Sequence, residues 1–184
     1  MARVIVAGDG PGGLSAALFL AKAGHQVEVI GRDETGMNRA YLRNYLGLPE
    51  TGGAEFQARA KAQVAAVGAI LRDATVTAVA AGVDGVTVEL DSGEVLVGGY
   101  LVLAEGKNPE LARSLGLAAD ERGGIRTNPE GLSALARVYV VGRAIRPGRS
   151  QAIISAGDGA RAALDILARE AGKDVQDWDT PPKA

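Results

Sequence analysis

Glycines near the start of the chain have the spacing of a phosphate-binding loop. The pattern Gly8-x-Gly10-x-x-Gly13 follows a short β-branched run and precedes an alanine-rich apolar stretch. In such a loop the first glycine permits a tight turn, the second lets the backbone approach a pyrophosphate, and the third lets a helix pack closely on the strand. The helix N-terminus then presents free N–H groups and partial positive charge to the anion. This context predicts that the chain binds a dinucleotide.

The end of the second predicted strand departs from the usual dinucleotide pattern. An acidic residue that binds the ribose is expected about 20 residues after the loop, but the strand ends with Ile30 and is followed by Gly31 and Arg32. Asp33 or Glu34 could reach the ribose hydroxyls from slightly further along. Alternatively, Arg32 could pair with the 2′-phosphate of NADP. A third interpretation makes Arg32 a solvated surface charge, and the sequence leaves the three open.

Composition excludes several other chemistries. The sequence has no cysteine and one histidine, so a redox dithiol, a thiolate nucleophile, an iron–sulfur cluster and a histidine cluster for a metal are all excluded. The net charge is −2 and no basic stripe occurs, so we expect neither nucleic acid nor a membrane surface as partner. No apolar run approaches the roughly 18 residues of a transmembrane helix. Because the first residues run directly into a strand, without a signal peptide, we expect a cytoplasmic protein.

The elements that surround the loop predict an α/β fold. A strand over 3–7, a helix over 14–23 and a strand over 26–30 form a βαβ unit. Further helices are predicted over 54–67, 110–115 and 151–171, the last with Ser150 as its N-cap. Further strands are predicted over 69–71, 75–80, 86–90, 94–97, 100–103 and 137–141.

The turns between these strands indicate how they are arranged. Asp84-Gly85 and Asp91-Ser92-Gly93 separate the strand candidates between residues 69 and 97, which predicts a small antiparallel meander. The chain then returns to the main sheet at 100–103. We predict a three-layer Rossmann-type fold with a parallel central sheet and this β-meander. The domain spans 1–173, and 174–184 form a C-terminal tail.

Four stretches carry a resemblance to a known family. They are VIVAGDGPGGLSAA over 4–17, NYLGLP over 44–49, LVLAEG over 101–106 and QAIISAGDGA over 151–160. The chain resembles the FAD-binding half of the thioredoxin-reductase-like flavoproteins, in the pyridine-nucleotide–disulfide oxidoreductase superfamily, from Val4 to Ala171. The resemblance implies FAD as cofactor. In that family the Gln-Ala pair of the last stretch opens a helix that faces the pyrimidine end of the flavin.

The chemistry of that last stretch also follows from its residues. A helix N-terminus stabilises the negative charge that a reduced flavin gathers at N1 and the C2 carbonyl. Gly157 and Gly159 lie inside the predicted helix, where each costs about 1 kcal/mol relative to alanine. Both glycines therefore predict close packing against another helix or the cofactor.

The resemblance also implies a set of cofactor-binding positions. It places Asn44 near the flavin ring, Val76 near the adenine, and Ala104 to Gly106 at a crossover near the pyrophosphate. Polar candidates near the ring are Ser15, Tyr41, Asn44, Tyr45 and Gln151. The full set that we expect to bind the cofactor is Gly8, Gly10, Pro11, Gly12, Gly13, Gly31, Arg32, Asn44, Val76, Ala104, Glu105, Gly106, Gly142, Arg143, Ser150, Gln151 and Ala152.

Three departures from the family pattern restrict the function. Gly31 stands where the acidic ribose residue belongs, and Arg143 follows Gly142 where an aspartate contacts the cofactor. The nicotinamide-binding domain with its redox dithiol, normally inserted after Gly106, is missing, since Gly124 follows in under 20 residues. We therefore expect a flavin-dependent oxidoreductase or electron carrier without dithiol chemistry, with NAD(P)H as an optional donor. Its substrate, redox partner and catalytic residue are unassigned.

Two alternatives remain open at this point. One is an NADP-binding reductase or sensor that uses Arg32. The other is a non-catalytic flavoprotein or interaction module, because the face that would dock the missing domain is uncovered and could bind a partner or a second copy of the chain.

Overall fold

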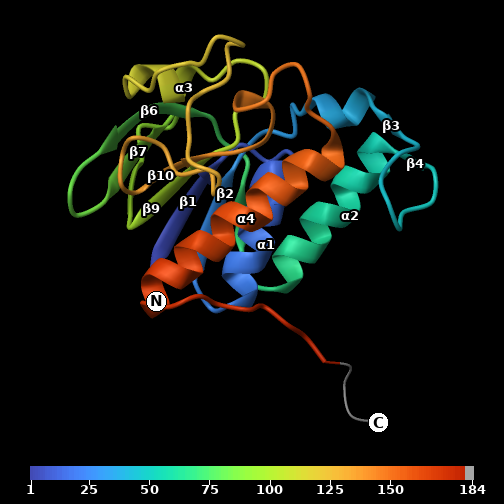
Figure 1. Cartoon of the computed structure of the whole chain (residues 1–184), viewed down its shortest axis with the longest axis horizontal. Helices are drawn as coiled ribbons and strands as arrows, with labels where there is room; N and C mark the ends of the chain where they lie inside the picture. The colour runs from blue at the N-terminus through green and yellow to red at the C-terminus, as the bar shows by residue number, and fades with distance from the viewer. Residues whose placement is uncertain (181–184) are drawn as a thin grey trace.

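The computed structural model describes residues 1–180 and has a parallel β-sheet at its centre (Figure 1). Its strands are β1 (Arg3–Ala7), β2 (Gln26–Ile30), β5 (Ile70–Arg72), β9 (Tyr100–Leu103) and β10 (Val138–Val140). Their order across the sheet is β10-β9-β1-β2-β5, and every neighbouring pair is parallel. The chain first leaves β1 toward β2 and later returns to its other side at β9. Such a reversal creates a crevice at the carboxyl ends of the strands, where α/β proteins bind ligands.

Three helices cover one face of the sheet, with α1 (Pro11–Lys22) between α2 (Gly53–Ala66) and α4 (Ala152–Ala171) (Figure 1). Strand side chains alternate between the two faces, so Val4 and Val6 of β1 join the core under these helices. A Cβ on Gly159 of α4 would overlap the carbonyl oxygen of Gly12 and lie 2.9 Å from its carbon. The glycine therefore lets α1 and α4 approach closely.

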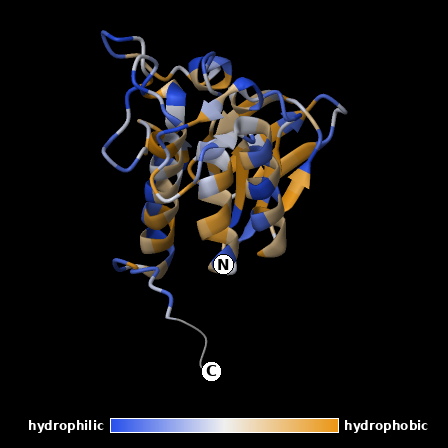
Figure 2. Ribbon diagram, turned by 90° about the vertical axis from the view of Figure 1, so that its right-hand side faces the viewer, coloured by the Kyte–Doolittle hydropathy of each residue, from blue (hydrophilic) through white to orange (hydrophobic). Residues whose placement is uncertain are grey.

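A smaller sheet and a short helix cover the opposite face. The strands β6 (Val76–Ala81), β7 (Val86–Leu90) and β8 (Val95–Gly98) are antiparallel, and the helix is α3 (Glu110–Ser114). Ile5 of β1 and Leu101 of β9 pack against Val88 in a second core cluster. The buried strands are mostly hydrophobic and the connecting loops mostly hydrophilic (Figure 2). The predicted three-layer fold with its β-meander is confirmed.

Two sequence predictions about the helices need correction. Close packing against another helix is confirmed for Gly159, whereas no atom of the described residues lies within 4 Å of a Cβ placed on Gly157. The N-cap of α4 is Gln151, which has extended backbone angles, and not Ser150. The first helix also begins earlier than predicted, at Pro11, whose fixed backbone angle suits the first helical position.

The predicted strand at 69–71 also lies in a different place from the one expected. It is β5, which pairs with β2 at the edge of the parallel sheet and not with the meander. Ion pairs hold this edge, because Glu28 of β2 is buried between two arginines. Arg72 Nε lies 2.7 Å from Glu28 Oε2, and Arg3 Nε donates to Oε1 over 2.9 Å.

The remaining described segments are short. Between β2 and α2 the chain forms the 3-10 helix η1 (Gly36–Arg39) and the strand pair β3 (Tyr41–Leu42) and β4 (Thr51–Gly52). The C-terminal tail crosses the end of α1, where Lys22 Nζ lies 2.8 Å from Asp177 Oδ1 and 2.5 Å from Asp179 Oδ2. Residues 181–184 of the predicted tail lie outside the described residues. None of the helices within 1–180 has both the length and the apolar character to cross a bilayer.

Candidate functional site

The glycine loop joins the carboxyl ends of the central strands. Gly8 has a positive φ of 112°, and a Cβ there would overlap the Ala104 carbonyl oxygen and lie 2.8 Å from its carbon. Its N–H donates to the Ile30 carbonyl over 2.8 Å. A Cβ on Gly13 would overlap the Gly8 carbonyl oxygen and lie 3.1 Å from Val6 Cγ1. The predicted roles of the first and last glycines, a tight turn and a close helix approach, therefore correspond to real steric limits.

The N-terminus of α1 has no side-chain cap. Gly10 is its N-cap residue, and its carbonyl accepts the Leu14 N–H over 2.9 Å. Gly12 and Gly13 follow Pro11 in the first turn, so no bulky side chain covers the backbone there. A Cβ on Gly10 would approach only Thr35 Oγ1, at 3.3 Å. Free N–H groups at a helix start bind anions such as phosphate.

The N-terminus of α4 is also uncapped and lies next to that of α1. No side chain caps its first turn, and a Cβ on Gly12 of α1 would lie 3.2 Å from the Ser155 carbonyl oxygen. Asn44 Nδ2 donates to Gln151 Oε1 over 3.3 Å, across 107 positions of sequence. Asn44 and Gln151, both expected near the flavin ring, are thus brought together, with Ala152 opening the helix beside them.

The other polar candidates are distributed differently. The Tyr45 ring packs on Phe56, with 5.4 Å between centroids. Tyr41 is exposed and lies under the Arg43 guanidinium. Ser15 belongs to α1 and is partly buried. These three side chains are not joined by hydrogen bonds to the Asn44–Gln151 pair among the described residues.

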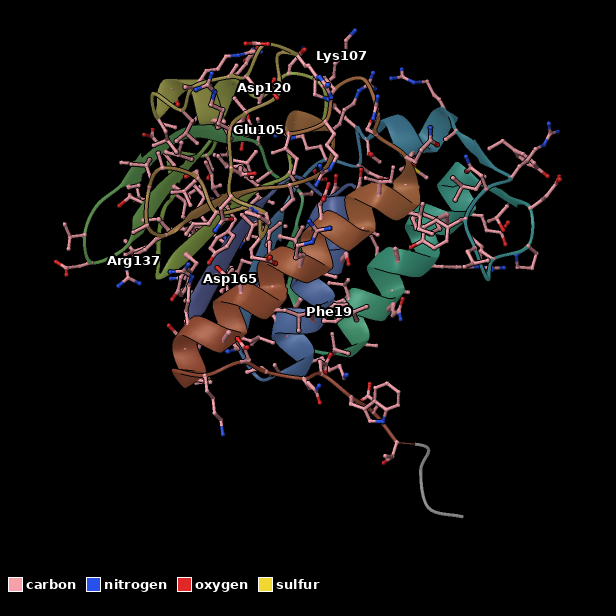
Figure 3. The ribbon with its side chains drawn as sticks, viewed as in Figure 1. Phe19, Glu105, Lys107, Asp120, Arg137 and Asp165 are labelled. Carbon is pink, nitrogen blue, oxygen red and sulfur yellow. The ribbon has the colours of Figure 1, made fainter. Side chains whose placement is uncertain are left out.

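The crossover after β9 approaches the loop through its backbone. The Ala104 N–H donates to the Ala7 carbonyl over 2.8 Å, and Gly106 has a positive φ of 70° with open space around it. The Glu105 carboxylate instead accepts the Leu111 and Ala112 N–H groups over 2.6 and 3.0 Å, and so caps α3 (Figure 3). Burial raises the pKa of Glu105, although these two hydrogen bonds partly offset the effect.

The segment after β10 forms the 3-10 helix η2 (Gly142–Ala144) and leaves the Arg143 side chain exposed. Gly142 has a φ of 70° and lies against Ser155 of α4. Sequence reasoning missed an ion pair nearby, in which Arg146 Nη2 lies 2.9 Å from the buried carboxylate of Asp158. The hydrogen bond from Arg146 to Asp158 raises the pKa of Arg146. This pair ties the η2 loop to α4.

The Arg32 side chain, shortly after β2, is paired with acidic side chains. Its Nη2 forms a close ion pair with Asp91, and its Nε lies 4.0 Å from Asp73 Oδ1. Together with Leu90 these residues line an open hollow of about 510 Å³. Val76 pairs with Leu90 across the meander but packs against the second core cluster. The NADP interpretation would therefore require Arg32 to give up Asp91.

Sequence reasoning also missed the role of Asp9, inside the glycine loop. Asp9 is only 7% exposed, and its Oδ2 accepts the Asp33 N–H over 2.9 Å. Lys61 Nζ lies 3.1 Å from Asp9 Oδ2 and 2.9 Å from Asp33 Oδ1. Partial burial lowers the pKa of Lys61, but its hydrogen bonds to Asp33 and Asp9 outweigh this and leave it raised. An acid inside the loop, combined with Gly31 after β2, was the available sequence signal.

These residues fit a dinucleotide such as the FAD that the resemblance implies. Two adjacent uncapped helix N-termini, bordered by glycines, suit a pyrophosphate and an electron-accepting ring. The one carboxylate within the loop, that of Asp9, is paired with Lys61, which it shares with Asp33.

Comparison with known proteins supports the fold. No family model matches the sequence, and no curated protein matches it. The solved structure of a thioredoxin reductase from Gloeobacter violaceus matches with a TM-score of 0.87 and 15% identity, covering 97% of this chain and 99% of that chain. An atypical thioredoxin reductase from Desulfovibrio vulgaris Hildenborough matches with a TM-score of 0.83 and 16% identity, covering 94% and 99%. A ferredoxin-flavin thioredoxin reductase from Clostridium acetobutylicum gives 0.81 and 15%, covering 94% and 99%. The chain has the fold of thioredoxin-reductase-type oxidoreductases.

Proposed function

We propose that the chain is an FAD-binding flavoprotein that acts as an oxidoreductase or electron carrier without dithiol chemistry. The observation that carries this proposal is the pair of uncapped N-termini of α1 and α4, placed side by side at the crevice where the strand order reverses. A mononucleotide needs one anion site, whereas FAD needs one for its pyrophosphate and a second for its ring.

Different segments of the chain would bind different parts of FAD. The N–H groups at the start of α1, with the Gly8–Gly13 loop, hold the pyrophosphate. The first turn of α4 stabilises negative charge on the pyrimidine part of the flavin, and Asn44 fixes the orientation of the Gln151 side chain at that helix start. Bound FAD supplies the hydride and electron transfer at its ring. The protein contributes position and electrostatics.

The direct test is the visible spectrum of the purified chain, followed by heat release and identification of any cofactor. We expect flavin absorbance bands and released FAD, either as purified or after incubation with FAD and removal of the excess. A colourless protein whose thermal stability does not change with added FAD would refute the proposal, because a ligand that binds the folded state raises its melting temperature.

Reduction under anaerobic conditions then separates the two flavoprotein alternatives. We expect NADH, NADPH or a reduced ferredoxin to bleach the bound flavin reversibly, and air or an added acceptor to restore its colour. Bound FAD that none of these donors reduces, while dithionite does, would favour the non-catalytic flavoprotein.

A further inference from the structure

We propose that Asp9 binds the adenosine ribose of the dinucleotide, and so replaces from within the glycine loop the acidic residue that the end of β2 lacks. This inference rests on the proposed function, because it concerns the adenosine half of the same cofactor. It concerns a carboxylate at a position that the dinucleotide pattern leaves unspecified.

The space occupied by the Asp9 side chain supports this exchange of position. A Cβ placed on Gly31 would overlap Asp9 Cγ and lie 2.7 Å from Asp9 Oδ1 and 2.8 Å from Asp9 Cβ. The carboxylate therefore occupies the volume in which a side chain at position 31 would begin. An acidic residue at position 31 and the present position of Asp9 exclude each other. The Asp9 side chain can therefore take its present position only because residue 31 is a glycine.

The two carboxylate oxygens of Asp9 have different surroundings. Oδ2 accepts the Asp33 N–H over 2.9 Å and lies 3.1 Å from Lys61 Nζ. No residue within 1–180 donates a hydrogen bond to Oδ1, the oxygen that lies toward Gly31. One oxygen is therefore held by the protein, and the other remains as an acceptor for a hydroxyl group. Ribose hydroxyls are the ligand groups that this position serves in dinucleotide-binding folds.

The neighbours of Asp9 hold its carboxylate in place. Gln57, which is 1% exposed, donates from Nε2 to the Asp9 carbonyl oxygen through a short hydrogen bond. Asp33 has a positive φ of 57°, which directs its N–H to Asp9. Lys61 lies between Asp9 and Asp33 and offsets part of the negative charge that would repel a nearby pyrophosphate. Lys61, Gln57 and Asp33 are positioning residues, whereas Asp9 contacts the ligand.

The carboxylate also borders space of suitable size. Asp9, Gly31 and Lys61 line a hollow of about 230 Å³ at the carboxyl end of β2. This hollow shares Arg32 and other lining residues with the larger hollow beside the meander. Together the two provide a place for a ribose next to the loop and for a base further out.

A cycle of substitutions in the full chain tests the proposal. The variants are Asp9→Ser, Gly31→Glu and the double variant, with the dissociation constant for FAD measured by flavin fluorescence quenching and folding monitored by thermal melting. Loss of a charge-assisted hydrogen bond should weaken FAD binding about tenfold in Asp9→Ser. Gly31→Glu alone should weaken binding at least as much and lower the melting temperature. The double variant should recover to within about threefold of the parent, because an acid then stands at the end of β2.

A matched control is Glu34→Gln, which removes an exposed carboxylate shortly after β2 and leaves Asp9 and its contacts with Asp33 and Lys61 in place. We expect its FAD affinity to stay within about twofold of the parent. The proposal is overturned if Asp9→Ser binds FAD like the parent, if Glu34→Gln shows the larger loss, or if the double variant is no better than Gly31→Glu. If Asp9→Ser does not fold, Asp9→Asn takes its place in the same cycle.

Calorimetric titration with ADP and 2′-deoxy-ADP separates failure of this inference from failure of the FAD proposal. The parent should prefer ADP by about tenfold, and Asp9→Ser should lose that preference. A parent that binds ADP with this preference but not FAD would refute the proposed function and retain the role of Asp9. Equal binding of both nucleotides by the parent, or binding of neither, would refute the role of Asp9.

Discussion

The two ends of the candidate cofactor site differ in the groups that form them: backbone N–H groups at one end and charged side chains at the other. At one end, for which we propose the pyrophosphate and the flavin and which we call the flavin end, the available donors are the N–H groups of the uncapped helices α1 and α4, bordered by glycines and by the neutral Asn44–Gln151 pair. At the other end, for which we propose the adenosine, charged side chains from distant segments come together, with Lys61 between Asp9 and Asp33, and Arg32 paired with Asp91. A backbone site depends on where helices begin and on close packing. In a side-chain site, the same chemical group can come from another position in the sequence, as we propose for the carboxylate of Asp9 beside Gly31.

The largest effect is expected from the packing that aligns the two helices of the flavin end. Gly159→Ala places a methyl group onto the Gly12 carbonyl of α1 and should lower the free energy of unfolding by about 2–3 kcal/mol. Gly157→Ala, two residues earlier on α4 and facing open space, should raise it by about 0.5–1 kcal/mol. Urea denaturation of both variants measures the difference. Equal effects would show that the helix contact does not align this end.

The flavin end does contain one buried charge, and its removal should be the next largest effect. Arg146→Ala leaves the Asp158 carboxylate buried without its partner. Because Arg146 itself is 41% exposed, we expect a loss of about 2 kcal/mol, below the value for a fully buried pair. The exposed Arg149 in the same loop is the control, and Arg149→Ala should change the free energy of unfolding by less than about 0.5 kcal/mol. Similar losses in both variants would contradict a special role for the Arg146–Asp158 pair.

A smaller effect is expected on the pH dependence of the free energy of unfolding, through Glu105 in the crossover after β9. The pKa of Glu105 is raised by burial above its ordinary value of 4.5, so the folded state binds its proton more tightly than the unfolded state. Its contribution to stability is therefore complete below pH 4.5 and is lost as pH rises through the folded pKa. Glu105→Gln should flatten the pH dependence of the free energy of unfolding over that interval. A steeper dependence in the variant would show that the sign is wrong.

The smallest effect is expected at Arg32, where the ion pair with Asp91 occupies the guanidinium. Arg32→Ala should change the NADPH dissociation constant by less than about twofold, since an exposed, already paired charge contributes little. Asp91→Asn should free Arg32 and strengthen NADPH binding relative to NADH. A large loss of NADPH affinity in Arg32→Ala would support the NADP interpretation. It would also show that the ion pair with Asp91 does not keep Arg32 from binding a phosphate.

The features that the sequence by itself determined are local. The turn at Gly8 and the meander turn at Gly93 depend on backbone angles and spacings within a few residues, and the patterns predicted them. The resemblance further implied that Asn44 and Gln151 serve one ring, and the structure joins them by a hydrogen bond.

Only the tertiary structure decided the features that depend on contacts between distant segments. The short run at Ile70–Arg72 could pair with either sheet, and it lies parallel to β2, where Arg72 also pairs with Glu28. Gly157 and Gly159 have the same local sequence cost, and only the approach of α1 distinguishes them. Asp9 and Gly31 are separated by more than 20 positions, and their complementarity becomes visible when β1 and β2 are aligned. Steric overlap and ion pairing act through space, and the order of residues along the chain does not encode those distances directly.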